Sequence, residues 1–364
     1  MRALLLVVLV GCSRSQPSAT VASASAAPVV ADAGPPAPKR VELAETDFRG
    51  TFNGAKLVAT LRAKDGIVTG SCFYEAFGAD IPLRGTAKDD GTLVVSEMKG
   101  DAAVSTVTLT RAADGTLSGT WSTPQKSGPA TLTPVVHAPG GTIEVATRPH
   151  VETSLAICGW NGSRYDREDS LKDVPKGPCR RASKAPVVLG LADRAFEKRL
   201  NDALFTDAKM AAPNNADGVG VDVTYTLPLS ERGILSVVFT AKFSCGNVPD
   251  CSVDNWVDAH NWGASFGVTV AVDAGVIAKS PADFVDFSKV RPVVRGVLAA
   301  GFAQCVSAGP EEGWSVQGAV LGESGLSIEH DECVNHVHSD AWTLVPYAKL
   351  GPALKAGPFE AAWK

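Results

Sequence analysis

Four pairs of residues suited to tight turns constrain the fold of this chain most strongly. Each pair is Asn or Asp followed by Gly, a combination that accepts the positive φ angles of two-residue hairpin turns. The stretches around them, such as 56–62, 67–75 and 104–110, are rich in β-branched residues or alternate in polarity. This spacing predicts an all-β antiparallel meander over 41–136, curled into a small lipocalin-like barrel or a sandwich. The pairs are Asn53-Gly54, Asp65-Gly66, Asp90-Gly91 and Asp114-Gly115.

The extreme N-terminus has the pattern of an exported protein. An apolar run from Ala3 to Val10 is too short for a lasting membrane span but fits the core of a signal peptide. It ends in Leu9-Val10-Gly11-Cys12, which matches the bacterial lipobox, where the cysteine is acylated. We therefore expect 1–12 to be a lipoprotein signal. Cys12 would carry fatty acyl chains such as palmitate and anchor the protein in the cell envelope, at the outer membrane if the organism has one.

Residues 13–40 follow as a stretch dominated by Ala, Ser and Pro, without aromatic residues. This composition predicts a disordered tether, so the folded part should begin near Val41. The net charge of −5 is mildly acidic, which argues against nucleic acid as a partner.

A second folded part is predicted over 143–364, after a Pro- and Gly-containing linker at 134–142. Apolar residues at helical spacing predict one helix at 191–205 and another at 287–306, the latter with Pro292 in its first turn. Together with strands, these elements indicate an α+β domain with two helices against an antiparallel sheet. The expected strands are 219–227, 235–243, a strand-turn-strand at 265–280, 314–321, 325–330 and 340–347.

The order of these elements resembles a known family. The segments are "APVVLGLADRAFEKRLNDAL", "ILSVVFTAKF", "DAHNWGASFGVTVAVDAGVI" and "WTLVPYAKLGPAL", within 185–356. They look like the extracytoplasmic domain of RsiV-type anti-sigma factors, a domain of unknown function of the 3298 type. A similar domain precedes the catalytic module of some peptidoglycan deacetylases.

The resemblance implies a binding role, because RsiV-type domains recognise lysozyme and the deacetylase version sits against peptidoglycan. The anti-sigma function itself is not expected, since it needs a cytoplasmic segment and a transmembrane helix. The turn Asp258-Ala259-His260 corresponds to a His-containing turn of the family, which usually has glycines where this chain has Val257 and Asp258. Indoles can stack on sugar rings, so the ligand-binding candidates here are Trp256, Asp258, His260 and Trp262.

Acidic residues are concentrated near the C-terminus, where 296–348 contains no Lys or Arg. These acids could form a negative face that attracts a cationic partner such as lysozyme. They could equally be scattered over several solvated surfaces. The candidates for such a face are Glu311, Glu312, Glu329 and Glu332.

Half of the six histidines lie in the stretch 329–342, which leaves two interpretations open. Extended backbone would project His336 and His338 from one face, and an H-x-H pair can hold a metal. The same residues are also typical of a solvated turn, and their spacing matches no known zinc motif. The metal candidates are His330, His336, His338 and Asp331.

The cysteines other than Cys12 fit an oxidising compartment, where disulfides persist. Proximity in sequence suggests three pairs, although other connectivities stay open. Cys72 would be the odd thiol, buried as a small hydrophobe. The expected pairs are Cys158–Cys179, Cys245–Cys251 and Cys305–Cys333.

No motif of a known enzyme class is present in the sequence: it contains no G-x-S-x-G, H-E-x-x-H or phosphate-binding loop. We therefore expect a non-enzymatic cell-envelope lipoprotein that needs no cofactor and binds lysozyme or peptidoglycan. A metal-dependent hydrolase of envelope polymers and a purely structural envelope protein are the alternatives.

Overall fold

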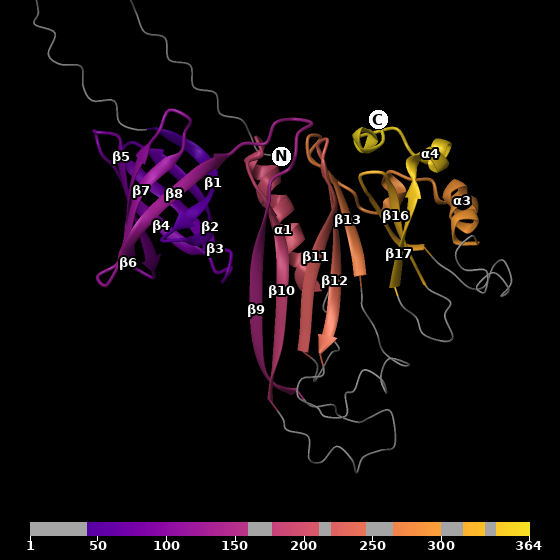
Figure 1. Ribbon diagram of the computed structural model, residues 1–364, viewed down its shortest axis with the longest axis horizontal. Helices are drawn as coiled ribbons and strands as arrows, with labels where there is room; N and C mark the ends of the chain where they lie inside the picture. Colours follow the sequence, from indigo (N-terminus) through magenta and orange to yellow (C-terminus); the bar gives the residue numbers. More distant parts are fainter. Residues whose placement is uncertain (1–41, 159–176, 211–219, 245–264, 300–315, 332–339) are drawn as a thin grey trace, which may run out of the picture. The chain divides into compact units, whose positions relative to one another are not determined.

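A computed structural model of the protein describes residues 42–158, 177–210, 220–244, 265–299, 316–331 and 340–364. The described part contains a closed eight-stranded barrel, a six-stranded sheet and a three-stranded sheet (Figure 1). The predicted fold class, an all-β module followed by an α+β part, is confirmed.

The barrel is an antiparallel meander in which each strand pairs with the next and β8 returns to β1. Alternate residues point inward, and large apolar side chains such as Phe48, Leu93 and Leu117 fill the interior, as is typical of barrels this small. The strands are β1 Leu43–Phe52, β2 Ala55–Lys64, β3 Ile67–Tyr74, β4 Ile81–Ala87, β5 Thr92–Lys99, β6 Ala102–Arg111, β7 Leu117–Ser122 and β8 Ser127–Val135.

Two of the four predicted hairpin turns have the expected form. Asn53-Gly54 and Asp65-Gly66 join adjacent strands directly, with positive φ at both residues. The prediction is wrong for the other two pairs, Asp90-Gly91 and Asp114-Gly115, which lie in longer loops with positive φ at the glycine alone. In each of these loops the Asp carboxylate accepts the backbone N–H two residues later, at 2.9 Å. This local hydrogen bond is typical of an Asx turn and favours the longer loop.

The second sheet has the order β14-β13-β12-β11-β10-β9. All its pairs are antiparallel except β10 with β11, which run parallel. The antiparallel sheet that the sequence predicted is therefore mixed at this one pair, because helix α1 (Arg194–Met210) makes the crossover that parallel neighbours need. The strands are β9 Val145–Cys158, β10 Gly177–Val188, β11 Gly220–Glu231, β12 Ile234–Ser244, β13 Ser265–Ala271 and β14 Val276–Ile277.

Helix α1 lies against one face of this sheet (Figure 1). Asp193 caps its first turn by accepting the N–H of Phe196 at 2.9 Å. Phe196, Leu200 and Leu204 are buried against the sheet, as the helical spacing predicted. With this face buried, the charged residues Arg194 and Glu197 lie beside it, at the start of α1.

The linker between barrel and sheet is held in place by one carboxylate. Asp273, in the turn between β13 and β14, lies 2.6 Å from Nε2 of His137 and accepts the N–H of Gly140 at 2.6 Å. The backbone of His137 also donates to the carbonyl of Gly190 at 2.9 Å. The predicted linker is thus hydrogen-bonded at His137 and Gly140 to the turn between β13 and β14, and at His137 also to Gly190, just after β10.

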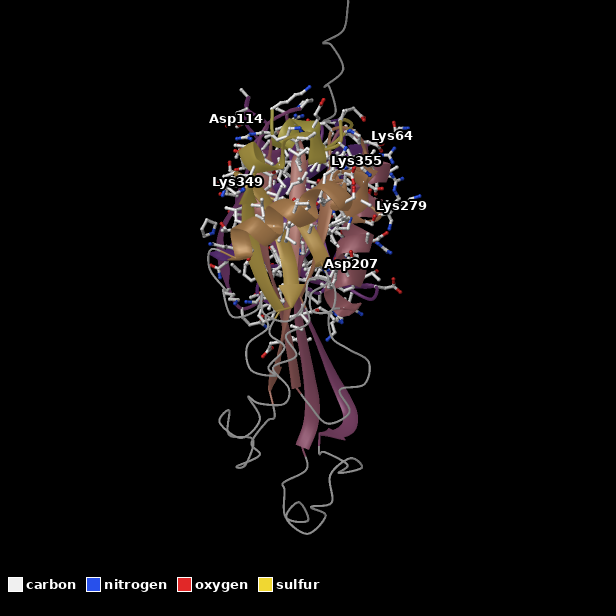
Figure 2. The ribbon with its side chains drawn as sticks, turned by 90° about the vertical axis from the view of Figure 1, so that its right-hand side faces the viewer. Lys64, Asp114, Asp207, Lys279, Lys349 and Lys355 are labelled. Carbon is white, nitrogen blue, oxygen red and sulfur yellow. The ribbon has the colours of Figure 1, made fainter. Side chains whose placement is uncertain are left out.

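The C-terminal elements form a third core with the three-stranded sheet. Helix α3 begins at Phe287, after Asp286 accepts the N–H of Ser288 at 3.1 Å. Pro292 therefore lies in the second turn, and the prediction of a first-turn position is wrong. Lys355, labelled in Figure 2, donates to the carbonyl of Ala282 at 2.5 Å. The remaining elements are β15 Val316–Leu321, β16 Gly325–Asp331, β17 Asp340–Pro346, α4 Tyr347–Leu350, and the short 3₁₀ turns η1 Pro281–Asp283, η3 Gly351–Ala353 and η4 Glu360–Ala362.

Candidate functional site: a cleft beside helix α1

Most of the site residues predicted from the sequence lie outside the described residues. They stay predictions: Cys12, Trp256, Asp258, His260, Trp262, Glu311, Glu312, Glu332, His336 and His338.

Three of the predicted residues have a described backbone position on β16. Glu329 pairs with Trp342, His330 with Ala341, and Asp331 with Asp340 in the β16–β17 hairpin. The register therefore brings two acidic residues, Asp331 and Asp340, opposite each other at one end of the sheet. Neither the metal interpretation nor the solvated-turn interpretation is decided by this register.

The cysteine pairs are also untested. The β9–β10 register places Cys158 opposite Gly177 and Cys179 opposite Ser154, so these two cysteines are not direct cross-strand partners. The other four cysteines of the predicted pairs are Cys245, Cys251, Cys305 and Cys333, and they lie outside the described residues. Cys72 is buried inside the barrel as a free thiol.

The described residues form a cleft of about 440 Å³ beside helix α1. Barrel strands supply one wall, and β10 and α1 supply the other. The volume lies in the range of small-molecule sites. Its lining combines apolar and charged side chains: Asp47, Val58, Thr60, Ser71, Cys72, Phe73, Asp80, Arg148, Val187, Leu189, Glu197, Lys198, Asn201, Asp202 and Phe205.

Asp47 of β1 is the most deeply buried charged group of the cleft, with 1% of its surface exposed. Arg194 of α1 donates to both of its carboxylate oxygens, at 2.5 and 2.7 Å. Gly190 N–H and the Thr60 hydroxyl add two more hydrogen bonds, at 2.9 and 2.7 Å. Burial alone would raise the pKa of Asp47, but these hydrogen bonds outweigh it and hold the pKa below its ordinary value. Asp47 is therefore an anion bound to α1.

Glu197 is the second buried carboxylate of the cleft. It receives the N–H of Leu191 at 2.7 Å and lies 2.8 Å from the same Arg194 guanidinium. Burial, followed by the negative charge of Asp47, raises the pKa of Glu197 to about 8, although Leu191 and Arg194 act in the opposite direction. The same guanidinium also lies 3.6 Å from the carboxylate of Glu45. It therefore serves three carboxylates, and Asp47 holds it in a bidentate geometry.

Arg148 of β9 makes a second bridge across the cleft. Its guanidinium lies 5.5 Å from the ring centroid of Phe73 and 5.3 Å from that of Phe205. It donates to the carbonyl of Gly78 at 2.8 Å and to Asp80 at 2.7 Å. At the rim, Lys198 and Asp202 form an exposed ion pair.

A different group of polar side chains lies inside the barrel, around Glu97. This carboxylate is 4% exposed and accepts hydrogen bonds from Tyr74 at 2.6 Å, from Trp121 Nε1 at 3.0 Å and from Ser105, with the Cys72 thiol at 3.8 Å. The donors saturate both oxygens, so we interpret this group as part of the barrel core.

The sequence alone did not single out the residues of the cleft. Asp47 and Arg194 are separated by 147 positions and share no motif. One residue of the cleft could have been found from the sequence. Glu197 directly follows Phe196 and falls on the apolar face of the predicted helix, together with Leu200. A carboxylate in that position predicts either a buried partner or a perturbed pKa.

Two solved structures are similar to this chain. One is a DUF3298 family member from Bacteroides fragilis, with 11% identity and a TM-score of 0.39, matched over 62% of this chain and 99% of that chain. The other is a DUF3298 family protein from Pseudomonas aeruginosa, with 9% identity and a TM-score of 0.36, over 59% and 96%. Both are consistent with the resemblance indicated by the sequence, but a likeness at this level says nothing about function. No protein-family model and no curated protein matches the sequence.

Proposed function

We propose that this protein is a lipid-anchored component of the bacterial cell envelope with a binding role. The observation that carries the proposal is the order of its parts. A lipobox ending at Cys12 precedes the Ala-, Ser- and Pro-rich stretch 13–40, and the first strand begins at Leu43, directly after it. A signal, a tether and a folded part in this order are what a displayed binding module needs. Within the described ranges, no helix is long and apolar enough to cross a bilayer.

The state of two buried carboxylates in the described part supports binding over catalysis. A general acid or base needs a free position from which to exchange a proton with a substrate. The carboxylate oxygens of Asp47 and Glu97 instead already accept hydrogen bonds from neighbouring side chains and backbone. We infer that these two groups stabilise the fold.

The partner that we propose is lysozyme or peptidoglycan glycan. The run 296–348 without Lys or Arg supports a cationic partner, and the β16–β17 register, with Asp331 opposite Asp340, is compatible with an acidic end of that hairpin. Attraction of this kind weakens as salt screens the charges.

Metabolic labelling with palmitate tests the anchor. The full chain should incorporate label and fractionate with membranes, and Cys12→Ser should lose both properties. Label retained by Cys12→Ser would show that the lipid is not at this residue.

A pull-down with lysozyme and with peptidoglycan sacculi, at low and moderate salt, tests the partner. Reversal of Glu311, Glu312, Glu329 and Glu332 to Lys should remove lysozyme binding. The matched control reverses four exposed acids of the barrel and should leave binding intact: Glu42, Asp65, Asp89 and Asp101. If neither lysozyme nor sacculi bind the wild-type protein, the proposed partner is wrong even when the anchor is confirmed.

A further inference from the structure

The barrel is docked against the second folded part through a patch of its own outer surface. Val58 of β2 and Phe73 of β3 alternate with residues that fill the barrel interior, so both side chains point outward. Such positions on a small barrel normally face water, yet only 3% of Val58 and 6% of Phe73 is exposed. Both pack in a small apolar cluster with Ala146 of β9 and with Leu189, which follows β10. This part of the barrel exterior is therefore an interface.

A polar joint lies beside this apolar cluster, at the corner between β10 and α1. Gly190 donates its N–H to Asp47 of β1 at 2.9 Å, and its carbonyl accepts the N–H of His137 at 2.9 Å. A Cβ atom on Gly190 would lie 2.6 Å from the carbonyl oxygen of Val135 on β8, and its φ is +79°. Glycine is the residue that suits this conformation and this close approach. The corner therefore contacts both strands that close the barrel.

Two arginines of the second part reach the barrel. Arg194 of α1 donates to both carboxylate oxygens of Asp47 and lies 3.6 Å from Glu45, which is also on β1. Arg148 of β9 donates to the carbonyl of Gly78, in the loop between β3 and β4, at 2.8 Å. Hydrogen bonds from a charged donor, above all bidentate ones, are stronger than those between neutral groups. These contacts join the two parts directly and do not pass through the linker 134–142.

We propose that the barrel is an intramolecular docking partner that covers the start of α1 and stays bound when the linker is cut. Arg194 decides the strength of this docking, because Asp47 is 1% exposed in the docked state and would otherwise be a buried charge without a cation. The start of α1 is closed to any envelope ligand as long as the barrel stays in place. The inference goes beyond the envelope-binding role and depends neither on the lipid anchor nor on the acidic segments near the C-terminus.

Cleavage of the linker in the full chain, with Cys12→Ser to prevent lipidation, tests the docking. A protease recognition sequence inserted after Gly140 lies in exposed chain, where a Cβ atom on Gly140 meets nothing within 4 Å. After cleavage, the two fragments should elute together in size-exclusion chromatography with light scattering, at the mass of the uncut protein, and should separate in urea. Cys72 of the barrel is a free thiol, so it makes no disulfide that could replace the linker. Fragments that elute separately in native buffer would overturn the proposal.

Variants of the cut chain locate the docking, with the association of the fragments measured by analytical ultracentrifugation over a dilution series. Arg194→Ala should weaken the association by at least about tenfold, because Asp47 then loses its cation. Arg199→Ala is the matched control and should bind as the wild type does, since Arg199 is exposed and lies over the Phe196 ring of its own helix.

A second variant acts from the barrel side and leaves Arg194 in place. Phe73→Ser removes an apolar contact of the interface without changing the barrel interior, and it should also weaken the association. Wild-type affinity in Arg194→Ala would contradict the role of Arg194. Wild-type affinity in both variants would overturn docking through this patch.

Discussion

At the scale of single residues, the carboxylate of Glu97 is the shared hydrogen-bond acceptor of the polar side chains inside the barrel. Its removal in Glu97→Ala would leave the buried donors of Tyr74, Ser105 and Trp121 without an acceptor. We expect Glu97→Ala to lower the free energy of unfolding by about 3–5 kcal/mol, measured by urea denaturation, because each unsatisfied buried donor is costly.

Glu97→Gln should cost less, since the amide keeps one acceptor oxygen in place. The exposed Glu42 serves as the control, and Glu42→Ala should change the free energy of unfolding by less than about 0.5 kcal/mol. A Glu97→Ala variant as stable as the Glu42→Ala variant would contradict the structural role of Glu97.

Cys72 lies beside this carboxylate, and its thiol should be unreactive in the native protein. Burial, and then the negative charge of Glu97, raise the pKa of the Cys72 thiol far above its ordinary value. Iodoacetamide labelling followed by mass spectrometry of the peptide that contains Cys72 should show slow alkylation in native buffer and fast alkylation in urea. Fast alkylation of that peptide in native buffer would mean that Cys72 is accessible.

At the scale of elements, glycines inside the barrel strands allow neighbouring strands to approach closely. A Cβ atom on Gly70 of β3 would overlap the carbonyl oxygen of Thr60 on β2, and one on Gly119 of β7 would overlap that of Thr108 on β6. Glycines at such positions are typical of tightly curled sheets. We expect Gly70→Ala and Gly119→Ala each to lower the free energy of unfolding by about 1–3 kcal/mol, because the strands have to move apart.

Gly296 of helix α3 provides a control of opposite sign. A Cβ atom there meets nothing within 4 Å, and the residue has ordinary helical backbone. Gly296→Ala should raise the free energy of unfolding by about 0.5–1 kcal/mol through helix propensity alone. Thermal and urea denaturation of the three variants compare the signs of the changes in unfolding free energy. A stabilising Gly70→Ala would refute the close approach of β3 to β2.

At the scale of the whole molecule, the contact between β1 and α1 makes stability depend on pH. The folded-state pKa of Glu197 is about 8, above the ordinary value of 4.5, so the folded protein binds a proton that the unfolded chain releases between these values. Its contribution to stability is fully present below about pH 4.5 and is lost as the pH rises towards 8. We expect the free energy of unfolding to fall across this window.

Urea denaturation at a series of pH values measures this dependence, with Glu197→Gln as the variant that should flatten it. Asp47 acts in a different window, because its pKa is lowered below 3.8 and its contribution is lost only in stronger acid. A decline between pH 4.5 and 8 that persists in Glu197→Gln would assign the effect to another group.

Much of the fold could be predicted because its signals are local. Alternating polarity and β-branched residues predicted the stretches 56–62, 67–75 and 104–110, which form β2, β3 and β6. Helical spacing predicted α1, which buries Phe196 and Leu200. The predictions failed where a neighbouring group changed a local preference. Asp90 and Asp114 accept the backbone N–H groups of Thr92 and Thr116 and favour longer loops. Helix α3 begins at Phe287 as expected, but this start leaves Pro292 in the second turn and not in the first.

The sequence by itself determined the meander and the amphipathic helix, while the signal and the tether stay predictions. These follow from composition, turn residues and periodicity, which act over a few residues. Only the tertiary structure decided that Arg194 meets Asp47 across 147 positions and is shared with Glu197. Such a pairing carries no sequence pattern, because it depends on barrel closure and on the crossover of α1 between parallel strands. The cleft and the Arg194 contacts are therefore properties of the folded chain.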